Sequence, residues 1–336
     1  MAATLTPSDP GRTLGVWEAD DVGVGEIGSA MARLRHQHRA AAVQTSVLTL
    51  VVVGAPAAIE GAAATVRDLG DQHPSRTLLI GIDPDDDAEA GLDARASLEL
   101  VVREGASVCY DEVRLRVRGR ARYHLDSVVE PFTLPDVPVV VWLPDDLPSP
   151  GDPLLPTVDR VVVDSRAVAQ ERPDTLARVA ALGRRLPVAD LSWYRLATWR
   201  SMLAGVFEGP AHRAFAAGVD EVVVRGNHGP RTLLAGWLLR RLGLEPEQVE
   251  VGPAAHVSVH LSATAGGRRA TFEVARRSDE RCVEAIIAVE GAPPVVQRVQ
   301  MRRRWPALAL ASALTTMGAD RSYAEALDGS MALVGR

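Results

Sequence analysis

The first half of the chain alternates short, continuous apolar runs with longer segments in which apolar residues recur every three or four positions. A continuous run is typical of a strand buried on both faces, and the longer spacing is typical of a helix with one buried face. The pattern predicts strands over residues 47–53, 77–82, 97–103, 112–117, 137–143 and 158–163, and helices over residues 27–42, 57–69 and about 120–129. This alternation indicates parallel strands joined by crossover helices, and thus a doubly wound, mostly parallel α/β domain.

The second half begins with helical patterns and then changes period. Helices are predicted over residues 173–183 and 191–207, a strand over 219–224, and a further helix with Pro230 in its first turn and Gly243 at its end. From Val257 onward apolar and polar residues alternate, and the pair Gly266-Gly267 marks a turn. Strands over 282–289 and 295–301 and two closing helices follow. We therefore expect a C-terminal α/β domain with helices and an antiparallel meander.

These patterns divide the chain into three parts. Residues 1–12 are rich in Thr, Pro, Ser and Asp and are predicted to be a disordered tail. The N-terminal α/β domain is expected over residues 13–170 and the C-terminal α/β domain over 171–336. Five prolines between residues 144 and 156 indicate a loop near the end of the first domain.

Composition narrows the class of protein. With 47% hydrophobic and 24% charged residues, the 336-residue chain can bury a substantial core. No apolar run approaches the roughly 18 residues that a membrane helix needs. The first ten residues lack the pattern of a signal peptide, so we expect a cytoplasmic protein. The net charge of −6 is spread over mixed acidic and basic residues, which argues against a nucleic-acid partner.

Most catalytic chemistries find no support in the sequence. All basic residues are Arg, which removes a P-loop lysine and a Schiff-base lysine together. Cys109 and Cys282 are too few for a disulfide framework and form no metal-binding pattern. Residues 23–28 read G-x-G-x-x-G, but acids precede them and no acid follows where a ribose ligand belongs, so we interpret them as a glycine-rich turn into a helix. The histidines lack metal-site spacing, and no G-x-S-x-G elbow occurs. We therefore expect no catalytic residue, metal or cofactor.

Two segments remain as candidate sites. In His73-Pro74-Ser75-Arg76, proline stiffens a turn and Arg76 can offer two parallel N–H donors to a phosphate or carboxylate. Alternatively, Ser75 satisfies the turn and Arg76 pairs with a nearby acid. The second segment begins at Asp190, which can cap the helix over 191–207. There, tryptophan and arginine either form an interface or pack into the core; the residues concerned are Trp193, Trp199 and Arg200.

Together these segments resemble one protein family, the glucose-6-phosphate dehydrogenase assembly proteins, or OpcA family. The resemblance is carried by the run from Glu60 through HPSR at 73–76, by PFTLPDVPVVVWLP at 131–144, by DLSWYRLATWR at 190–200 and by AGWLLRRL at 235–242. Many relatives have a second Trp after Trp142, where this chain has Leu143. The order and spacing of these segments extend over almost the whole chain.

The resemblance implies a non-enzymatic partner that binds glucose-6-phosphate dehydrogenase and promotes its active oligomeric state in the oxidative pentose phosphate pathway. An alternative is a module or enzyme that binds sugar phosphates, with Arg76 as the anion hook, and a purely structural scaffold is a third interpretation. The candidate anion-binding or interface residues are His73, Ser75, Arg76, Asp136, Trp142, Asp190, Trp193, Trp199 and Arg200.

Overall fold

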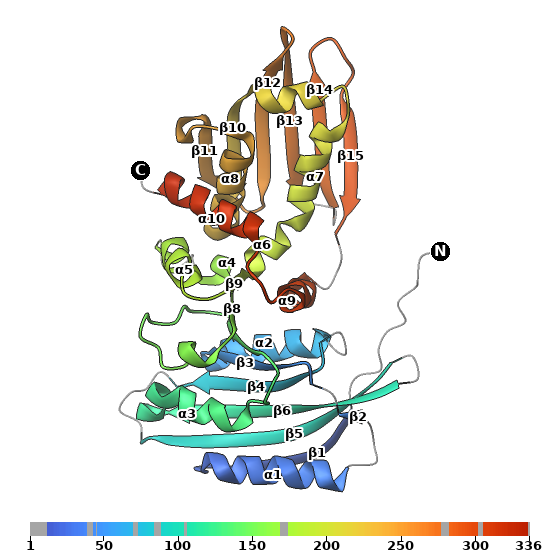
Figure 1. Cartoon of the computed structure of the whole chain (residues 1–336). Coiled ribbons are helices and arrows are strands. Elements are labelled where there is room, and N and C mark those ends of the chain that lie inside the picture. Colours follow the sequence, from blue (N-terminus) through green and yellow to red (C-terminus); the bar gives the residue numbers. More distant parts are fainter. Residues whose placement is uncertain are drawn as a thin grey trace. The chain divides into compact units, whose positions relative to one another are not determined.

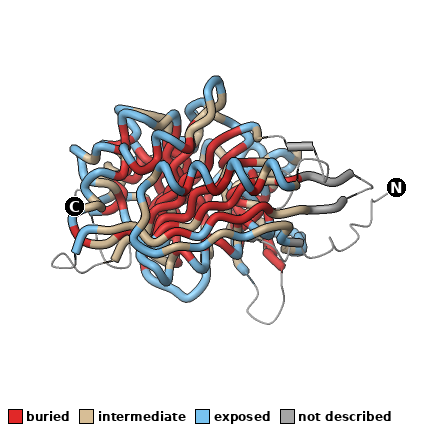
Figure 2. Tube along the Cα trace, turned by 90° about the horizontal axis from the view of Figure 1, so that it is seen from below, coloured by how far each residue is buried: buried red, intermediate tan, exposed pale blue. Residues whose placement is uncertain are grey.

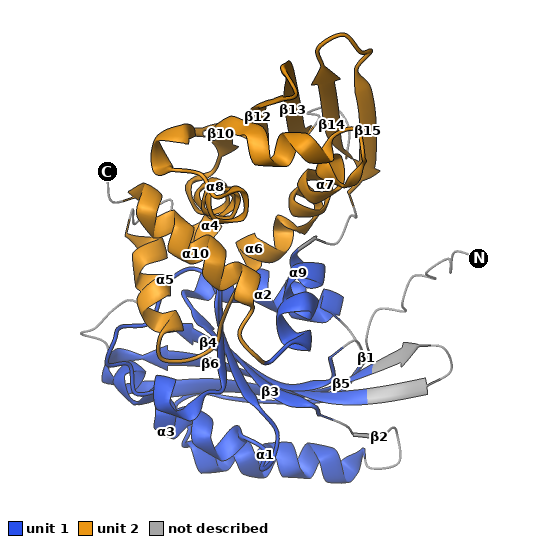
Figure 3. Cartoon of the chain, turned by 45° about the horizontal axis from the view of Figure 1, so that its top comes forward, with its two compact units in different colours: residues 1–163, 306–317 blue, residues 164–305, 318–336 orange. Residues whose placement is uncertain are grey.

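The computed structural model describes residues 12–38, 43–44, 46–69, 73–83, 89–103, 106–168, 174–276, 282–301 and 305–334. The chain divides into two compact units, coloured separately in Figure 3: Met1–Val163 with Pro306–Met317, and Asp164–Trp305 with Gly318–Arg336. The linear domain boundary near residue 170 stays a prediction. Of the predicted tail, residues 1–11 lie outside the described residues, and Arg12 is already the first residue of a strand.

The first unit is built on a mostly parallel sheet (Figure 1). Its strands are β1 (Arg12–Ala19), β2 (Val43–Gln44), β3 (Leu48–Gly54), β4 (Ser75–Ile82), β5 (Gly91–Arg103), β6 (Ala106–Arg118), β7 (Val139–Leu143) and β8 (Arg160–Val163). They are arranged in the order β1-β5-β6-β4-β3-β7-β8, with β2 beside β6. The pairs from β6 to β8 are parallel, and β5 pairs antiparallel with β1 and β6.

Helices cover both faces of this sheet. They are α1 (Val24–Gln37), α2 (Pro56–Leu69), the 3-10 helix η2 (Gly119–His124), α3 (Leu125–Val129), the 3-10 helices η3 (Glu130–Phe132) and η4 (Leu155–Thr157), and α9 (Trp305–Thr315). All of α9 except Trp305 belongs to this unit. Successive side chains of a strand point to opposite faces, so Asp111 and Arg114 of β6 lie on different sides of the sheet. Asp111 pairs with Arg35 of α1, whereas Arg114 pairs with Glu60 of α2. The two helices therefore pack on opposite faces, as a doubly wound fold requires.

The continuous apolar runs form the central strands, as predicted. Every residue of β7 is buried, and so is β3 from Leu48 to Val53, because both strands lie between layers of helices (Figure 2). Two predictions need correction. The helix predicted from residue 27 begins at Val24 and ends at Gln37, and the helix predicted near 120–129 is a 3-10 turn followed by the short α3. The edge strand β1 and the two-residue β2 were not predicted.

The second unit combines helices with a mostly antiparallel sheet (Figure 1). Its helices are α4 (Ser165–Val168), α5 (Thr175–Gly183), α6 (Leu191–Arg195), α7 (Ala197–Glu208), η5 (Arg213–Gly218), α8 (His228–Leu242), η6 (Pro246–Gln248) and α10 (Arg321–Val334). Its strands are β9 (Val188–Asp190), β10 (Val219–Gly226), β11 (Val249–Pro253), β12 (Ser258–Ala265), β13 (Arg268–Arg276), β14 (Cys282–Val289) and β15 (Val295–Gln300). The sheet has the order β11-β10-β12-β13-β14-β15, in which only β10 and β11 are parallel.

Strands β12 to β15 form the antiparallel meander that was predicted from the alternation of apolar and polar residues. The predicted helix ending is also confirmed, since Gly243 follows α8 with φ of +64°, a left-handed conformation that glycine adopts without strain. Helices α8 and α10 cross at glycine: a Cβ atom on Gly236 would lie 2.3 Å from the carbonyl oxygen of Ala326. This close backbone contact fixes the position of α10 over α8.

The helix predicted over residues 191–207 is interrupted. Leu196 has ψ of −3° and separates α6 from α7. An uninterrupted helix would need ψ near −42° there. The side chains of Leu196, Trp199 and Leu203 are nevertheless all buried, so the segments on both sides of the bend bury their apolar residues as the predicted helix would.

Candidate functional site

Arg76 lies in the first unit, in a partly buried ion-pair cluster with Asp111 and Arg35. Asp111 is buried, and both of its carboxylate oxygens accept hydrogen bonds from Arg35 of α1, with an Nε to Oδ1 distance of 3.1 Å. The Nε atom of Arg76 lies 3.2 Å from Oδ2 of the same carboxylate, and its NH1 donates to the carbonyl oxygen of Phe132 at 3.0 Å. Arg76 thus connects β4, β6 and η3. Burial, followed by the charge of Arg35, lowers the pKa of Arg76.

The neighbouring residues of the HPSR segment also make internal contacts. Ser75 and Arg76 are the first residues of β4 rather than part of a turn. The Ser75 hydroxyl lies 3.0 Å from that of Thr77 in the core, and Nε2 of His73 lies 3.4 Å from the hydroxyl of Thr315. Partial burial lowers the pKa of His73. Of the two interpretations of this segment, the pairing of Arg76 with an acid is the contact observed, and anion binding stays a prediction.

Trp142 and Asp136 lie near each other in sequence but in different environments. Trp142 of β7 is buried, and its indole Nε1 has no hydrogen-bond partner among the described residues. Asp136 is exposed, in a turn before β7, with a left-handed φ of +63°. Asp136 is therefore the one of the five candidates in this unit that is exposed, and its side chain can meet another molecule without rearrangement.

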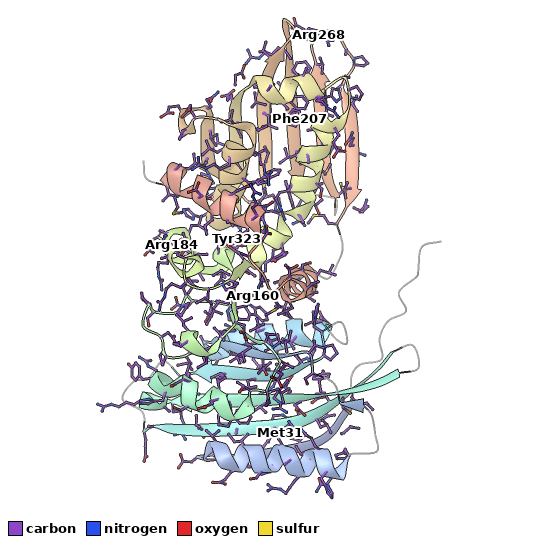
Figure 4. All side chains as sticks on the ribbon, viewed as in Figure 1. Met31, Arg160, Arg184, Phe207, Arg268 and Tyr323 are labelled. Atoms are coloured by element: carbon purple, nitrogen blue, oxygen red, sulfur yellow. The ribbon has the colours of Figure 1, made fainter. Side chains whose placement is uncertain are left out.

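Asp190 organises the candidate site of the second unit. Its side chain is fully buried, and Oδ1 accepts hydrogen bonds from the backbone N–H of Ser192 at 2.9 Å and of Ser165 at 3.1 Å. The first of these contacts confirms the predicted cap of the helix that begins at Leu191. The hydroxyl of Tyr323, from the first turn of α10 (Figure 4), lies 3.4 Å from Oδ2. Burial and the nearby charge of Asp164 raise the pKa of Asp190 to about 6.

A second carboxylate, Asp164, supports the same turn. Its Oδ1 accepts hydrogen bonds from the hydroxyl of Ser192 at 2.9 Å and from NH1 of Arg195 at 2.6 Å. Burial is the largest influence on Arg195 and lowers its pKa, but the Asp164 carboxylate and the charge of Asp190 together outweigh it, so the pKa of Arg195 is raised overall. The two carboxylates therefore hold α6 at its N-terminus, one through backbone groups and one through side chains.

Trp193, Trp199 and Arg200 are packed in the interior of the second unit. The Trp193 indole is fully buried and donates from Nε1 to Asp320 at 2.9 Å. The guanidinium of Arg200 lies over the Trp193 ring, 3.7 Å from its centroid, a favourable cation–π geometry. Burial lowers the pKa of Arg200. Trp199 is also buried and donates to the carbonyl oxygen of Val257 at 3.2 Å.

The predicted site residues thus fall into two clusters, one in each unit. The residues that complete the clusters were not among the sequence candidates; they are Arg35, Asp111, Asp164, Asp320 and Tyr323. One usable signal existed for Asp164, because it directly follows a predicted buried strand, where functional acids of α/β sheets commonly lie. The others lie far from their partners in sequence, and no local pattern marks them.

The glycine-rich segment and the two cysteines belong to the secondary structure and the core. Gly23 precedes α1 as its N-cap, while Gly25 and Gly28 lie inside the helix, so residues 23–28 form a turn into a helix as interpreted. Cys109 and Cys282 are both buried. Within the described ranges, no group of three or more His, Cys, Asp or Glu side chains is arranged to hold a metal ion. No helix in the same ranges combines the length and apolarity needed to cross a membrane.

Comparison with known proteins identifies the family. A model of the glucose-6-phosphate dehydrogenase subunit N-terminal domain matches residues 66–181, and a model of the corresponding C-terminal domain matches residues 186–327. A protein of Synechocystis sp. named as OxPP cycle protein OpcA is 25% identical over 187 residues, which are 53% of this chain and 39% of that protein. Proteins of the same name from Nostoc punctiforme and Synechococcus elongatus are each 24% identical, over 55% and 52% of this chain and 42% and 41% of their own lengths. The matched region thus spans less than half the length of these relatives. Because the two domain models together match most of the chain in the expected order, the chain belongs to the OpcA family of glucose-6-phosphate dehydrogenase assembly proteins.

Proposed function

We propose that this protein binds glucose-6-phosphate dehydrogenase in the cytoplasm and promotes its active oligomeric state in the OxPP cycle, as an allosteric activator that catalyses no reaction itself. The observation that carries this proposal is the consecutive match to both domains of a glucose-6-phosphate dehydrogenase subunit. A protein that acts in this way needs a rigid surface with higher affinity for one state of its partner.

The construction of the second-unit cluster supports a structural role for its residues. A general acid or base must come within hydrogen-bond distance of its substrate. Asp190 has a pKa suited to proton transfer near neutrality, but its side chain is fully buried and held by Ser165, Ser192 and Tyr323. Arg200 stacks on Trp193 in the same interior. These groups are suited to fixing α6 and α7 rigidly.

The contacts of Arg76 likewise favour the assembly role over a sugar-phosphate site. Its side chain is 14% exposed, and its guanidinium is already bound to Asp111 and to the carbonyl oxygen of Phe132. A phosphate would have to displace the buried carboxylate of Asp111 from this guanidinium. Calorimetry with glucose 6-phosphate and 6-phosphogluconate separates the two functions: a saturable heat that disappears in Arg76→Ala would establish the sugar-phosphate site instead.

The assembly proposal is tested by mixing the purified chain with the dehydrogenase. We expect the two to co-elute in size-exclusion chromatography, with a larger dehydrogenase oligomer and a shifted saturation curve for glucose 6-phosphate. The matched control is the chain unfolded by heat, added at equal mass. Absence of co-elution together with unchanged kinetics would refute the proposal. Turnover of glucose 6-phosphate by the chain alone would refute its non-catalytic part.

A further inference from the structure

Strand β15 forms an exposed apolar edge of the second unit's sheet. It is the last strand in the sheet order, next to β14, and Figure 1 shows it at the margin of the sheet. All six of its residues are exposed. Among them Val295, Val296 and Val299 are 44%, 52% and 43% exposed, although valine is normally a core residue.

The apolar side of this edge continues a buried layer of the sheet. Val295 pairs with Ile287 of β14, and Val299 pairs with Val283. Ile287 and Val283 are both fully buried, and directly paired residues share one face of a sheet. The buried layer therefore runs across β14 and ends at two exposed valines, where nothing among the described residues covers them.

Two other edge strands among the described residues, β11 and β1, have protective features that β15 lacks. An exposed edge presents unpaired backbone groups, and proteins usually protect it with charges, prolines or bulges. Strand β11, at the opposite edge of the same sheet, contains Glu250 and ends at Pro253. Strand β1 has an irregular register between Thr13 and Gly15. Strand β15 contains a single charge, Arg298, which pairs with Glu284 of β14 at 2.6 Å.

We propose that β15 is a self-association edge, at which two copies of this chain pair their β15 strands antiparallel and join their sheets into one. A two-fold axis through such a pair places one residue opposite itself. With Gln297 at the axis, Val295 of each copy lies opposite Val299 of the other, and Val296 lies opposite Arg298. The two interrupted apolar layers then meet and cover each other.

Neighbouring registers are less favourable, so the pairing is specific. An axis at Arg298 would place two like charges directly opposite each other, which is destabilising. An axis at Val296 would place Val295 opposite Gln297 and leave Val299 beyond the partner strand. Self-pairing about Gln297 is thus the arrangement that buries all the valines of the apolar face. This inference concerns the chain alone and holds whether or not the dehydrogenase proposal is correct.

Cysteine cross-linking tests the register. Gln297→Cys places a thiol opposite its own copy, whereas in Val295→Cys the two thiols are separated by four residues of strand, about 14 Å. Both positions are exposed on the same face, so Val295→Cys is the matched control. A bis-maleimide shorter than that separation should link Gln297→Cys into dimers and leave Val295→Cys unlinked. Equal linking of both, or of neither, would overturn the proposed pairing. The unsubstituted chain, whose cysteines are buried, sets the background.

Sedimentation equilibrium tests the association itself. The wild-type chain, with a mass of 35.9 kDa, should approach twice that mass as its concentration rises into the micromolar range. Val299→Lys should remain monomeric, because a charge would face the partner's Val295. The control is Val16→Lys in β1, where the valine is equally exposed at 43% but lies at another edge; it should dimerise like wild type.

Two outcomes would contradict the proposal. One is a wild-type chain that stays monomeric throughout the series. The other is dissociation by Val16→Lys as complete as that by Val299→Lys, which would mean that the edge has no special role. If the chain is monomeric and Val299→Lys weakens dehydrogenase binding, the self-association is equally overturned, and the edge belongs to the other partner.

Discussion

Replacing Asp190 by asparagine should stabilise the protein at neutral pH, although the residue is fully buried and caps a helix. The substitution keeps the shape of the side chain. Its amide oxygen can accept the hydrogen bonds from the backbone N–H of Ser192 and Ser165, which both reach Oδ1 in the wild type. Its amide NH₂ takes the place of Oδ2 and can donate to the hydroxyl oxygen of Tyr323, which lies 3.4 Å away. The change removes the charge and keeps both backbone donors bonded, while the Tyr323 hydroxyl, which donates to Oδ2 in the wild type, becomes an acceptor and its own proton loses this partner.

The magnitude follows from the titration of the carboxyl. Burial and Asp164 raise the pKa of Asp190 from 3.8 to about 6. The unfolded chain releases this proton near pH 4 and the folded chain only near pH 6, so the contribution of this group to stability falls as the pH rises through that window. At about 1.4 kcal/mol per unit, the buried carboxylate costs the folded state about 3 kcal/mol at neutral pH. Asparagine carries no such cost.

Urea unfolding of both proteins, followed by tryptophan fluorescence between about pH 4 and pH 7, measures the difference. We expect Asp190→Asn to match the wild type near pH 4 and to exceed it by up to about 3 kcal/mol near pH 7. The control is Asp190→Ala, which also lacks the charge but leaves the same partners without an acceptor, so it should be less stable than Asp190→Asn by about 3 kcal/mol or more at both pH values. An advantage of Asp190→Asn that does not change with pH, or a loss at pH 7, would show that the buried carboxylate does not destabilise the folded state.

Three further predictions concern packing and buried groups. Asp111→Ala should lower the free energy of unfolding by about 3 kcal/mol, since it leaves Arg76 buried without its carboxylate; an effect below about 1 kcal/mol in urea unfolding would contradict the assigned burial. Gly236→Ala should cost about 2 kcal/mol or more, because its methyl group meets the backbone of α10, whereas Gly205→Ala in α7, with open space around the added Cβ, should gain up to about 1 kcal/mol. Similar melting temperatures for the two alanine variants would contradict the close crossing of α8 and α10. Burial, followed by the charge of Asp111, raises the pKa of the Cys109 thiol, so a thiol reagent at neutral pH should label Cys109 only in denaturant, and rapid labelling of the folded chain would contradict this.

The sequence predicted the elements that depend on local pattern. Central strands such as β3 and β7 consist of apolar, mostly β-branched runs, because a strand between two helical layers has no polar face. The edge strand β1 escaped prediction because it has one glycine, mixed polarity and mostly exposed or half-exposed residues. Its pairing with β5, more than 70 residues away, defines it instead. The bend at Leu196 also escaped prediction, since neither glycine nor proline marks it and tertiary contacts of the flanking helices hold it.

The candidate site shows the same division between local and distant contacts. The cap by Asp190 on Ser192 spans two residues, and a sequence pattern can predict it. The contact of Asp190 with Tyr323 spans 133 residues, and that of Arg76 with Phe132 spans 56. Only the folded topology brings such pairs together. Propensity and periodicity therefore predicted the helix cap at Asp190, but not the distant side chains that surround it.

The burial of the residues that mark the family limits which of them can contact another protein. Trp142, Trp193 and Trp199 are all at most 6% exposed, and Arg200 stacks inside the second unit. Buried side chains of this kind fix the fold and cannot touch a second protein unless the unit opens. The residues by which the family is most easily identified are thus those least able to form its interface directly. Under the proposed function the dehydrogenase contacts exposed groups instead, and among the sequence candidates the exposed turn at Asp136 is the place where a surface substitution can separate binding from folding.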